Sequence, residues 1–181
     1  MVWMFPKIKM TKGIMISLIV YGMFVILLLM SAVGKQFFQL PIHLTFSVSL
    51  RSLIDPVVVL GKLILVYLVV SLIPIRWILV VPTFLFYPVV LMDLLGSIIF
   101  LINGNIGGLL AGLLQMITFA MILYFLSMIT LRTIHNNQYI KSTHYVIRWV
   151  KSLKISIPEY WQPLLFWMVV HWLALAFVQT K

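Results

Sequence analysis

Long apolar runs separated by short polar segments make up most of this chain. A helix needs about 20 predominantly apolar residues to cross the hydrocarbon core of a bilayer. Five runs come close to that length or exceed it. The pattern therefore predicts an all-α integral membrane protein with about five transmembrane helices in a single polytopic domain, residues 1–181. The predicted spans cover residues 13–33, 57–75, 77–102, 106–131 and 161–178.

Residues 40–51 depart from this pattern, because apolar and polar positions alternate along them. A period of two is typical of an extended β-strand. A lone strand leaves its own N–H and C=O groups unpaired, so we expect this segment outside the hydrocarbon, against a partner edge. The alternative is an amphipathic loop on the outer interface. The sequence thus predicts a short, extracytoplasmic β-like segment.

The one sizeable polar stretch, residues 132–160, has helical periodicity. Its cationic side chains recur at three- and four-residue steps, which places them on one face of a helix over residues 139–154, with apolar positions opposite. The cationic face consists of Lys141, His144, Arg148 and Lys151. A basic amphipathic helix suits an anionic inner leaflet or a cytoplasmic partner. We expect Ile157-Pro158 to end it.

The composition supports the membrane assignment. The chain is 64% hydrophobic and 9% charged, whereas soluble domains contain about 25% charged residues. Lys and Arg total 13 against three acidic residues, and most of these cations fall in segments that an N-in, C-out topology places inside. This explains the net charge of +10 without a nucleic-acid partner. We expect a multi-pass protein of a cell membrane, and the abundance of Ile, Leu and Lys favours a bacterial cytoplasmic membrane.

Four polar side chains lie at similar depth within the predicted spans: Lys62, Asp93, Gln115 and His171. Ionisable groups at such depth usually pair with each other or line a wet path. One hypothesis is a site for an ion, a proton or a substrate, with Asp93 titrating near kinks at Pro82 and Pro88. The other is structural, with an Asp93–Lys62 ion pair and hydrogen bonds from the two remaining residues. Lys62 could also extend to the interface along its own stem, and Asp93 could face another subunit.

Glycines recur at four-residue spacing where the fourth predicted span begins: Gly104, Gly108 and Gly112. This spacing places them on one helical face, which lets a neighbouring backbone approach closely. Asn103-Gly104-Asn105 is the predicted turn between the third and fourth spans. A phosphate-binding loop would require a following Gly-Lys-Ser/Thr, which the sequence lacks, so we interpret the glycines as a packing seam.

The sequence contains no motif that indicates catalysis. It lacks H-E-x-x-H, and Asp93 is its one intramembrane acid, whereas an aspartyl intramembrane protease needs two. Zero cysteines exclude thiolate chemistry and cysteine metal sites, and we expect no metal and no cofactor.

We therefore predict a small non-catalytic subunit of a larger membrane assembly for transport, secretion or energy coupling. Its contact surfaces would be the glycine seam, the outer β-like segment and the basic helix. Its partners would be anionic lipids and other membrane subunits or further copies of itself. A small transporter or ion-conducting protein with a polar site around Asp93 is the first alternative. A membrane-embedded enzyme acting on lipid or peptide is the weakest.

Overall fold

The computed structural model describes residues 19–24, 26–27, 44–45, 50–141, 144–177 and 179–180. The chain forms two compact units, Met1–Leu40 and Pro41–Lys181, where the sequence predicts one domain. In the first unit, residues 19–24 and 26–27 are helical and fall within the predicted span 13–33. Both ends of that span lie outside the described residues.

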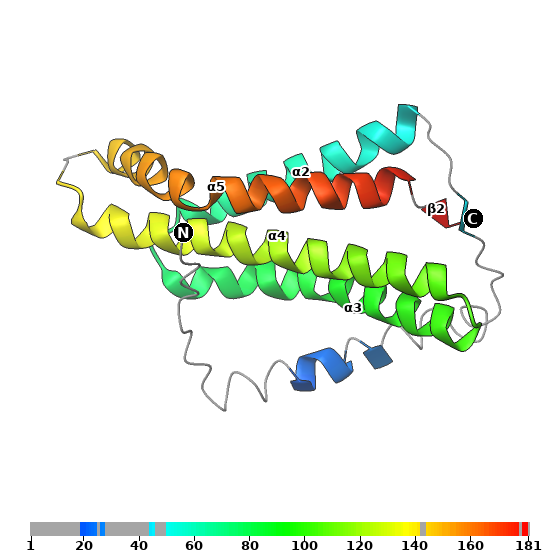
Figure 1. The fold of residues 1–181 in the computed structure, drawn as a ribbon. Coiled ribbons are helices and arrows are strands. Elements are labelled where there is room, and N and C mark those ends of the chain that lie inside the picture. The colour runs from blue at the N-terminus through cyan, green and yellow to red at the C-terminus, as the bar shows by residue number, and fades with distance from the viewer. Residues whose placement is uncertain are drawn as a thin grey trace. The chain divides into compact units, whose positions relative to one another are not determined.

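The described part of the second unit consists of four long helices, one short 3-10 helix and two short strands (Figure 1). These are α2 (Leu50–Ser71), η2 (Arg76–Leu79), α3 (Val80–Ile102), α4 (Ile106–Tyr139) and α5 (Tyr145–Phe177). Among the described residues, three segments are long and apolar enough to cross a membrane: Leu50–Ser71, Arg76–Ile102 and Ile106–Tyr139. The predicted helical membrane class is therefore confirmed, whereas five spans in an N-in, C-out arrangement stay a prediction.

Helices α2 and α4 extend beyond their predicted spans because of contacts between helices. Helix α2 begins at Leu50, not at residue 57, and continues through Pro56. Its first turns are held by the Trp172 indole of α5, whose Nε1 donates to the Leu53 carbonyl at 2.8 Å. Helix α4 continues past residue 131 to Tyr139 because its polar end hydrogen-bonds to α5.

Both prolines of the third predicted span lie within helical backbone. Pro82 lies in the first turn, where a backbone N–H has no helical acceptor in any case. Pro88 lies inside the helix, yet α3 runs unbroken from Val80 to Ile102. Neither proline therefore interrupts the helix.

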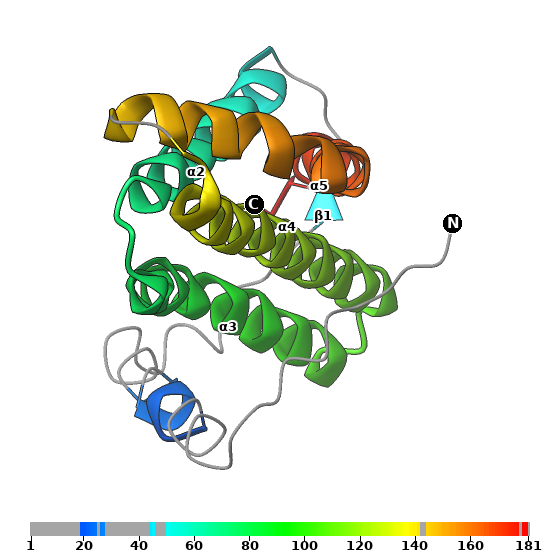
Figure 2. The same cartoon turned by 90° about the vertical axis from the view of Figure 1, so that its left-hand side faces the viewer.

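The predicted break at Ile157-Pro158 is wrong, because α5 is one helix that contains both Pro158 and Pro163. Figure 2 shows that this helix changes direction between its amber beginning and its red end. Proline removes one backbone donor and crowds the preceding turn, so it bends a helix that tertiary contacts hold on both sides. We call residues 145–157 the first limb of α5 and residues 158–177 the second limb. Lys141 and His144, predicted to be helical, precede the helix.

The predicted β-like segment 40–51 is described at only four positions. Leu44–Thr45 forms strand β1, which pairs antiparallel with strand β2, Gln179–Thr180. Leu50 and Arg51 are helical, contrary to the prediction, and an ion pair from Arg51 to Asp55 stabilises this first turn of α2. The remaining residues of the segment lie outside the described part of the chain.

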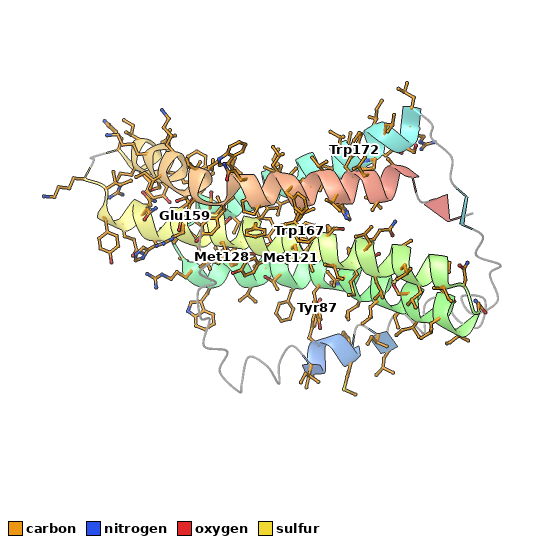
Figure 3. The ribbon with its side chains drawn as sticks, viewed as in Figure 1. Tyr87, Met121, Met128, Glu159, Trp167 and Trp172 are labelled. Carbon is orange, nitrogen blue, oxygen red and sulfur yellow. The ribbon has the colours of Figure 1, made fainter. Side chains whose placement is uncertain are left out.

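Helix α4 lies at the centre of the bundle and contacts α2, α3 and α5 (Figure 2). The apolar core comes mainly from α2 and α4, and Trp167 and Trp172 of α5 pack against it (Figure 3). Many aliphatic side chains of the apolar helices point outward and are exposed, whereas several Ser and Thr side chains are buried. Apolar outer faces over a partly polar interior fit a bundle surrounded by lipid.

Candidate functional site

The structure does not bring Asp93 and Lys62 together. Asp93 is half-buried on α3, and its carboxylate has no hydrogen bond or ion pair with any described residue. Lys62 is exposed on α2. The structural hypothesis of an Asp93–Lys62 ion pair therefore has no support in the described residues.

Close packing between α3 and α4 places Asp93 level with Gln115. The Ser97 hydroxyl donates to the Asp93 carbonyl at 2.7 Å and lies against Gly112 of α4. Phe100 lies in the same way against Gly108. The two helices run antiparallel. Asp93 lies about one turn before Ser97 on α3, and Gln115 lies about one turn after Gly112 on α4, so both are displaced in the same direction from the Ser97–Gly112 contact. Asp93 and Gln115, both half-buried, thus occupy one level.

Two of the three predicted seam glycines lie at this helix contact. A Cβ atom on Gly112 would lie 2.4 Å from Ser97 Oγ, and one on Gly108 would lie 2.2 Å from a ring carbon of Phe100. Gly104 instead occupies the turn with φ +69°, a conformation that favours glycine. The Asn105 side chain caps α4 by accepting from Gly108 N at 2.9 Å. The seam is therefore used within the chain, contrary to its predicted role as a surface for partners.

His171 ties the second limb of α5 to α4. Its side chain is 5% exposed, and its Nδ1 lies 2.8 Å from Thr118 Oγ1. The same hydroxyl lies 2.8 Å from the Leu114 carbonyl and 3.0 Å from the Gln115 carbonyl. A hydroxyl has one proton to donate, so when a carbonyl takes it the imidazole must donate from Nδ1. Through Thr118, His171 is thus linked to the backbone carbonyls of Leu114 and Gln115, and these hydrogen bonds do not include Asp93.

A polar network at the other end of the bundle escaped the sequence analysis. The Trp149 indole of α5 donates to Ser71 Oγ at 3.0 Å, and Ser71 Oγ donates to the Leu68 carbonyl at 2.6 Å. The Tyr145 hydroxyl donates to the Leu72 carbonyl. Since the last carbonyls of a helix have no helical donor, the first limb of α5 caps the C-terminal end of α2.

The same end joins α4 to α5 through side-chain hydrogen bonds. Asn136 Nδ2 donates to Ser156 Oγ at 3.2 Å. Close by, Arg132 forms a 3.1 Å ion pair with Glu159, which is labelled in Figure 3. Ser152 and Ser156 are fully buried. Their four-residue spacing is the sequence signal that could have revealed this contact, because small residues so spaced let helices approach.

The first limb of α5 thus has three distinct faces. Its serines and aromatic residues face the bundle. A second face is apolar and exposed, with Val146, Val150 and Ile157. A third carries the exposed Lys151 and the half-buried Arg148, whose guanidinium carbon lies 5.6 Å from the Tyr145 ring centre. The other two predicted cations, Lys141 and His144, are exposed and precede the limb.

The described residues contain no group of three or more His, Asp or Glu side chains able to hold a metal ion. No protein family, curated protein or solved structure matches this chain.

Proposed function

We propose that this chain is a non-catalytic subunit of a larger membrane assembly and that the first limb of α5 is its docking surface. The observation that carries the proposal is the fixed position of this limb. Tyr145 and Trp149 hold it to α2, and Ser156 holds it to α4. A surface that is ordered before binding loses less conformational entropy when a partner docks.

The outward faces of the limb provide two kinds of contact. Val146 is 62% exposed and lies beside further exposed aliphatic side chains, whereas Lys151 and Lys154 are exposed cations. In the proposed N-in, C-out topology of a bacterial cytoplasmic membrane, this limb lies on the inner side. It would contact anionic lipid there and present cations to an acidic cytoplasmic or membrane partner.

Buried polar side chains within the apolar helices also favour a structural protein. Thr118 bonds to His171, and Tyr67 accepts a hydrogen bond from Ser127 at 3.3 Å. Such bonds between helices stabilise association in lipid. In an ion-conducting path, these polar side chains would instead face water.

The test is purification of the tagged full chain from its own host in mild detergent, followed by the mass and composition of the intact particle. Stoichiometric partners that are lost with the double variant Lys151→Gln and Lys154→Gln would support the proposal. The matched control is Lys62→Gln, which removes an exposed cation far from the limb. A lone monomer or a homo-oligomer would overturn the subunit proposal.

A transporter is the second candidate, and one observation favours it. The Asp93 carboxylate is half-buried in an apolar helix and has no partner among the described residues. Intramembrane acids of this kind often bind ions or protons during transport. In proteoliposomes, Asp93→Asn would abolish flux while the protein stays folded, and absence of flux from the unmodified chain would reject this candidate.

A further inference from the structure

We infer that the first limb of α5 inserts into an apolar groove with an acidic rim on a water-soluble partner protein. The inference rests on the proposed function, because it takes this limb as the docking surface, and it adds the chemistry of the partner.

The first limb lies across one end of the bundle. Tyr145 and Trp149 hold its beginning to the C-terminal end of α2, and Ser156 holds its end to α4. Figure 2 shows the limb crossing this end of the bundle before α5 turns into its second limb. The limb therefore presents the whole length of its outer side, as a helix does when it docks in a groove.

Apolar and cationic side chains alternate around this outer side. Each residue advances about 100° around a helix axis. In order around the axis, the exposed residues are Val150, Lys154, Ile147, Lys151 and Ile155. Neighbours in this order are about 20–40° apart. The two isoleucines are 45% and 58% exposed, so each lysine stands between two aliphatic side chains that the chain itself leaves uncovered.

This alternation favours a protein over a lipid as the cover of the limb. A helix in a bilayer interface places its apolar side chains on one face and its charges on the other. A bilayer boundary that covered both Val150 and Ile155 would also bury Lys151 and Lys154, which lie between them. A groove in a protein can cover all of them, because apolar walls can meet the aliphatic side chains while carboxylates meet the lysines.

The carboxylates must come from the partner. The sequence has three acidic residues. Asp55 pairs with Arg51, and Glu159 pairs with Arg132, while Asp93 belongs to the middle of α3. No acidic side chain of this protein is left to compensate the lysines of the limb, so charge complementarity predicts an acidic rim on the groove.

The surroundings of the limb indicate that the partner is water-soluble. The limb belongs to the one sizeable polar stretch of the sequence, residues 132–160. At this end of the bundle, the ion pair between Arg132 and Glu159 is about half exposed, and Arg76 bonds to His135 at 3.0 Å on the surface. Charged and polar side chains of this kind are favoured in water over hydrocarbon.

The test is cysteine labelling in native membranes, where single cysteines report alone because the sequence contains none. Ile147→Cys and Ile155→Cys are each introduced into the full chain in its own host, and inside-out membrane vesicles are treated with a membrane-impermeant maleimide. The vesicles are then washed with urea, which removes water-soluble partners and leaves the bilayer. We expect the labelling rate of both cysteines to rise at least about fivefold after the wash, as for a surface that a partner occupies most of the time. Returning the dialysed wash should restore the protection.

Leu65→Cys is the matched control, because Leu65 is an aliphatic residue that is 62% exposed on the apolar helix α2. It should label slowly before and after the wash, as expected under lipid. The double change Lys151→Gln and Lys154→Gln, added to each limb cysteine, should give fast labelling even before the wash, because the acidic rim loses its cations. Arginine at both positions keeps the charge and should keep the protection.

Slow labelling of the limb cysteines both before and after the wash would indicate lipid cover and overturn the inference. Fast labelling in both states, protection of only one cysteine, or protection that survives the double glutamine change would overturn it as well. None of these results rejects the subunit proposal, which depends on the composition of the purified particle. A lone particle in that purification would reject a stable subunit, and protection removed by the wash would then indicate transient docking.

Discussion

Replacing Gly112 with alanine measures how tightly α3 and α4 are packed. The new Cβ would lie 2.4 Å from Ser97 Oγ and 3.5 Å from Ser97 Cα. The backbone distance is an ordinary contact, so the clash is with the hydroxyl alone. That hydroxyl donates to the Asp93 carbonyl at 2.7 Å and must rotate away or push the helices apart.

Two opposing contributions determine the size of the effect. Overpacking of a close contact costs about 1–3 kcal/mol, whereas alanine is favoured over glycine in a helix by about 1 kcal/mol. We therefore expect Gly112→Ala to lower the unfolding free energy by about 0–2 kcal/mol. In a Ser97→Ala background the clash disappears, so the same change should raise the unfolding free energy by about 1 kcal/mol.

The assay is a double-mutant cycle on the unfolding free energy, measured by titrating the detergent-solubilised chain with dodecyl sulfate. The expected coupling energy between the two positions is about 1–3 kcal/mol. Gly96→Ala is the control, because a Cβ on Gly96 of α3 meets no atom within 4 Å. A coupling energy below about 0.5 kcal/mol would refute the reasoning, since independent sites are additive within that error.

Three further predictions use the same unfolding assay. Thr118→Val should cost about 1–3 kcal/mol, because the buried histidine of α5 loses its partner; an unchanged midpoint would contradict that hydrogen bond. Tyr145→Phe should cost about 0.5–1.5 kcal/mol, because the Leu72 carbonyl loses its donor, and limited proteolysis should then cleave near the start of α5 sooner. Lys62→Gln should change the unfolding free energy by less than about 0.5 kcal/mol, as substitutions at exposed sites do. A loss of several kcal/mol would instead support the hypothesis of an ion pair between Lys62 and Asp93.

The positions of the apolar helices could be predicted because hydrophobicity is a local property of the chain. Each of α2, α3 and α4 contains a long, predominantly apolar run. The turn at Gly104 also follows from local chemistry, since glycine between two asparagines readily adopts the positive φ observed there. Four-residue spacing likewise indicated that Gly108 and Gly112 share a face.

The candidate site could be predicted only in part. Depth along each span suggested that Asp93, Lys62, Gln115 and His171 would meet. Depth does not specify direction around the helix axis, and Lys62 points outward while His171 points to Thr118. Sequence periodicity shows which residues share a helical face, but it does not show which other helix packs against that face.

The sequence by itself determined that the chain is helical, with segments apolar enough to cross a membrane, and roughly where those segments lie. Only the tertiary structure decided that α5 continues through Pro158 and that its first limb caps α2 through Tyr145 and Trp149. The physical reason is that hydrophobic period and charge depend on neighbouring residues. A helix end or a hydrogen bond between helices depends instead on residues far away in the chain, whose approach only the packed bundle defines.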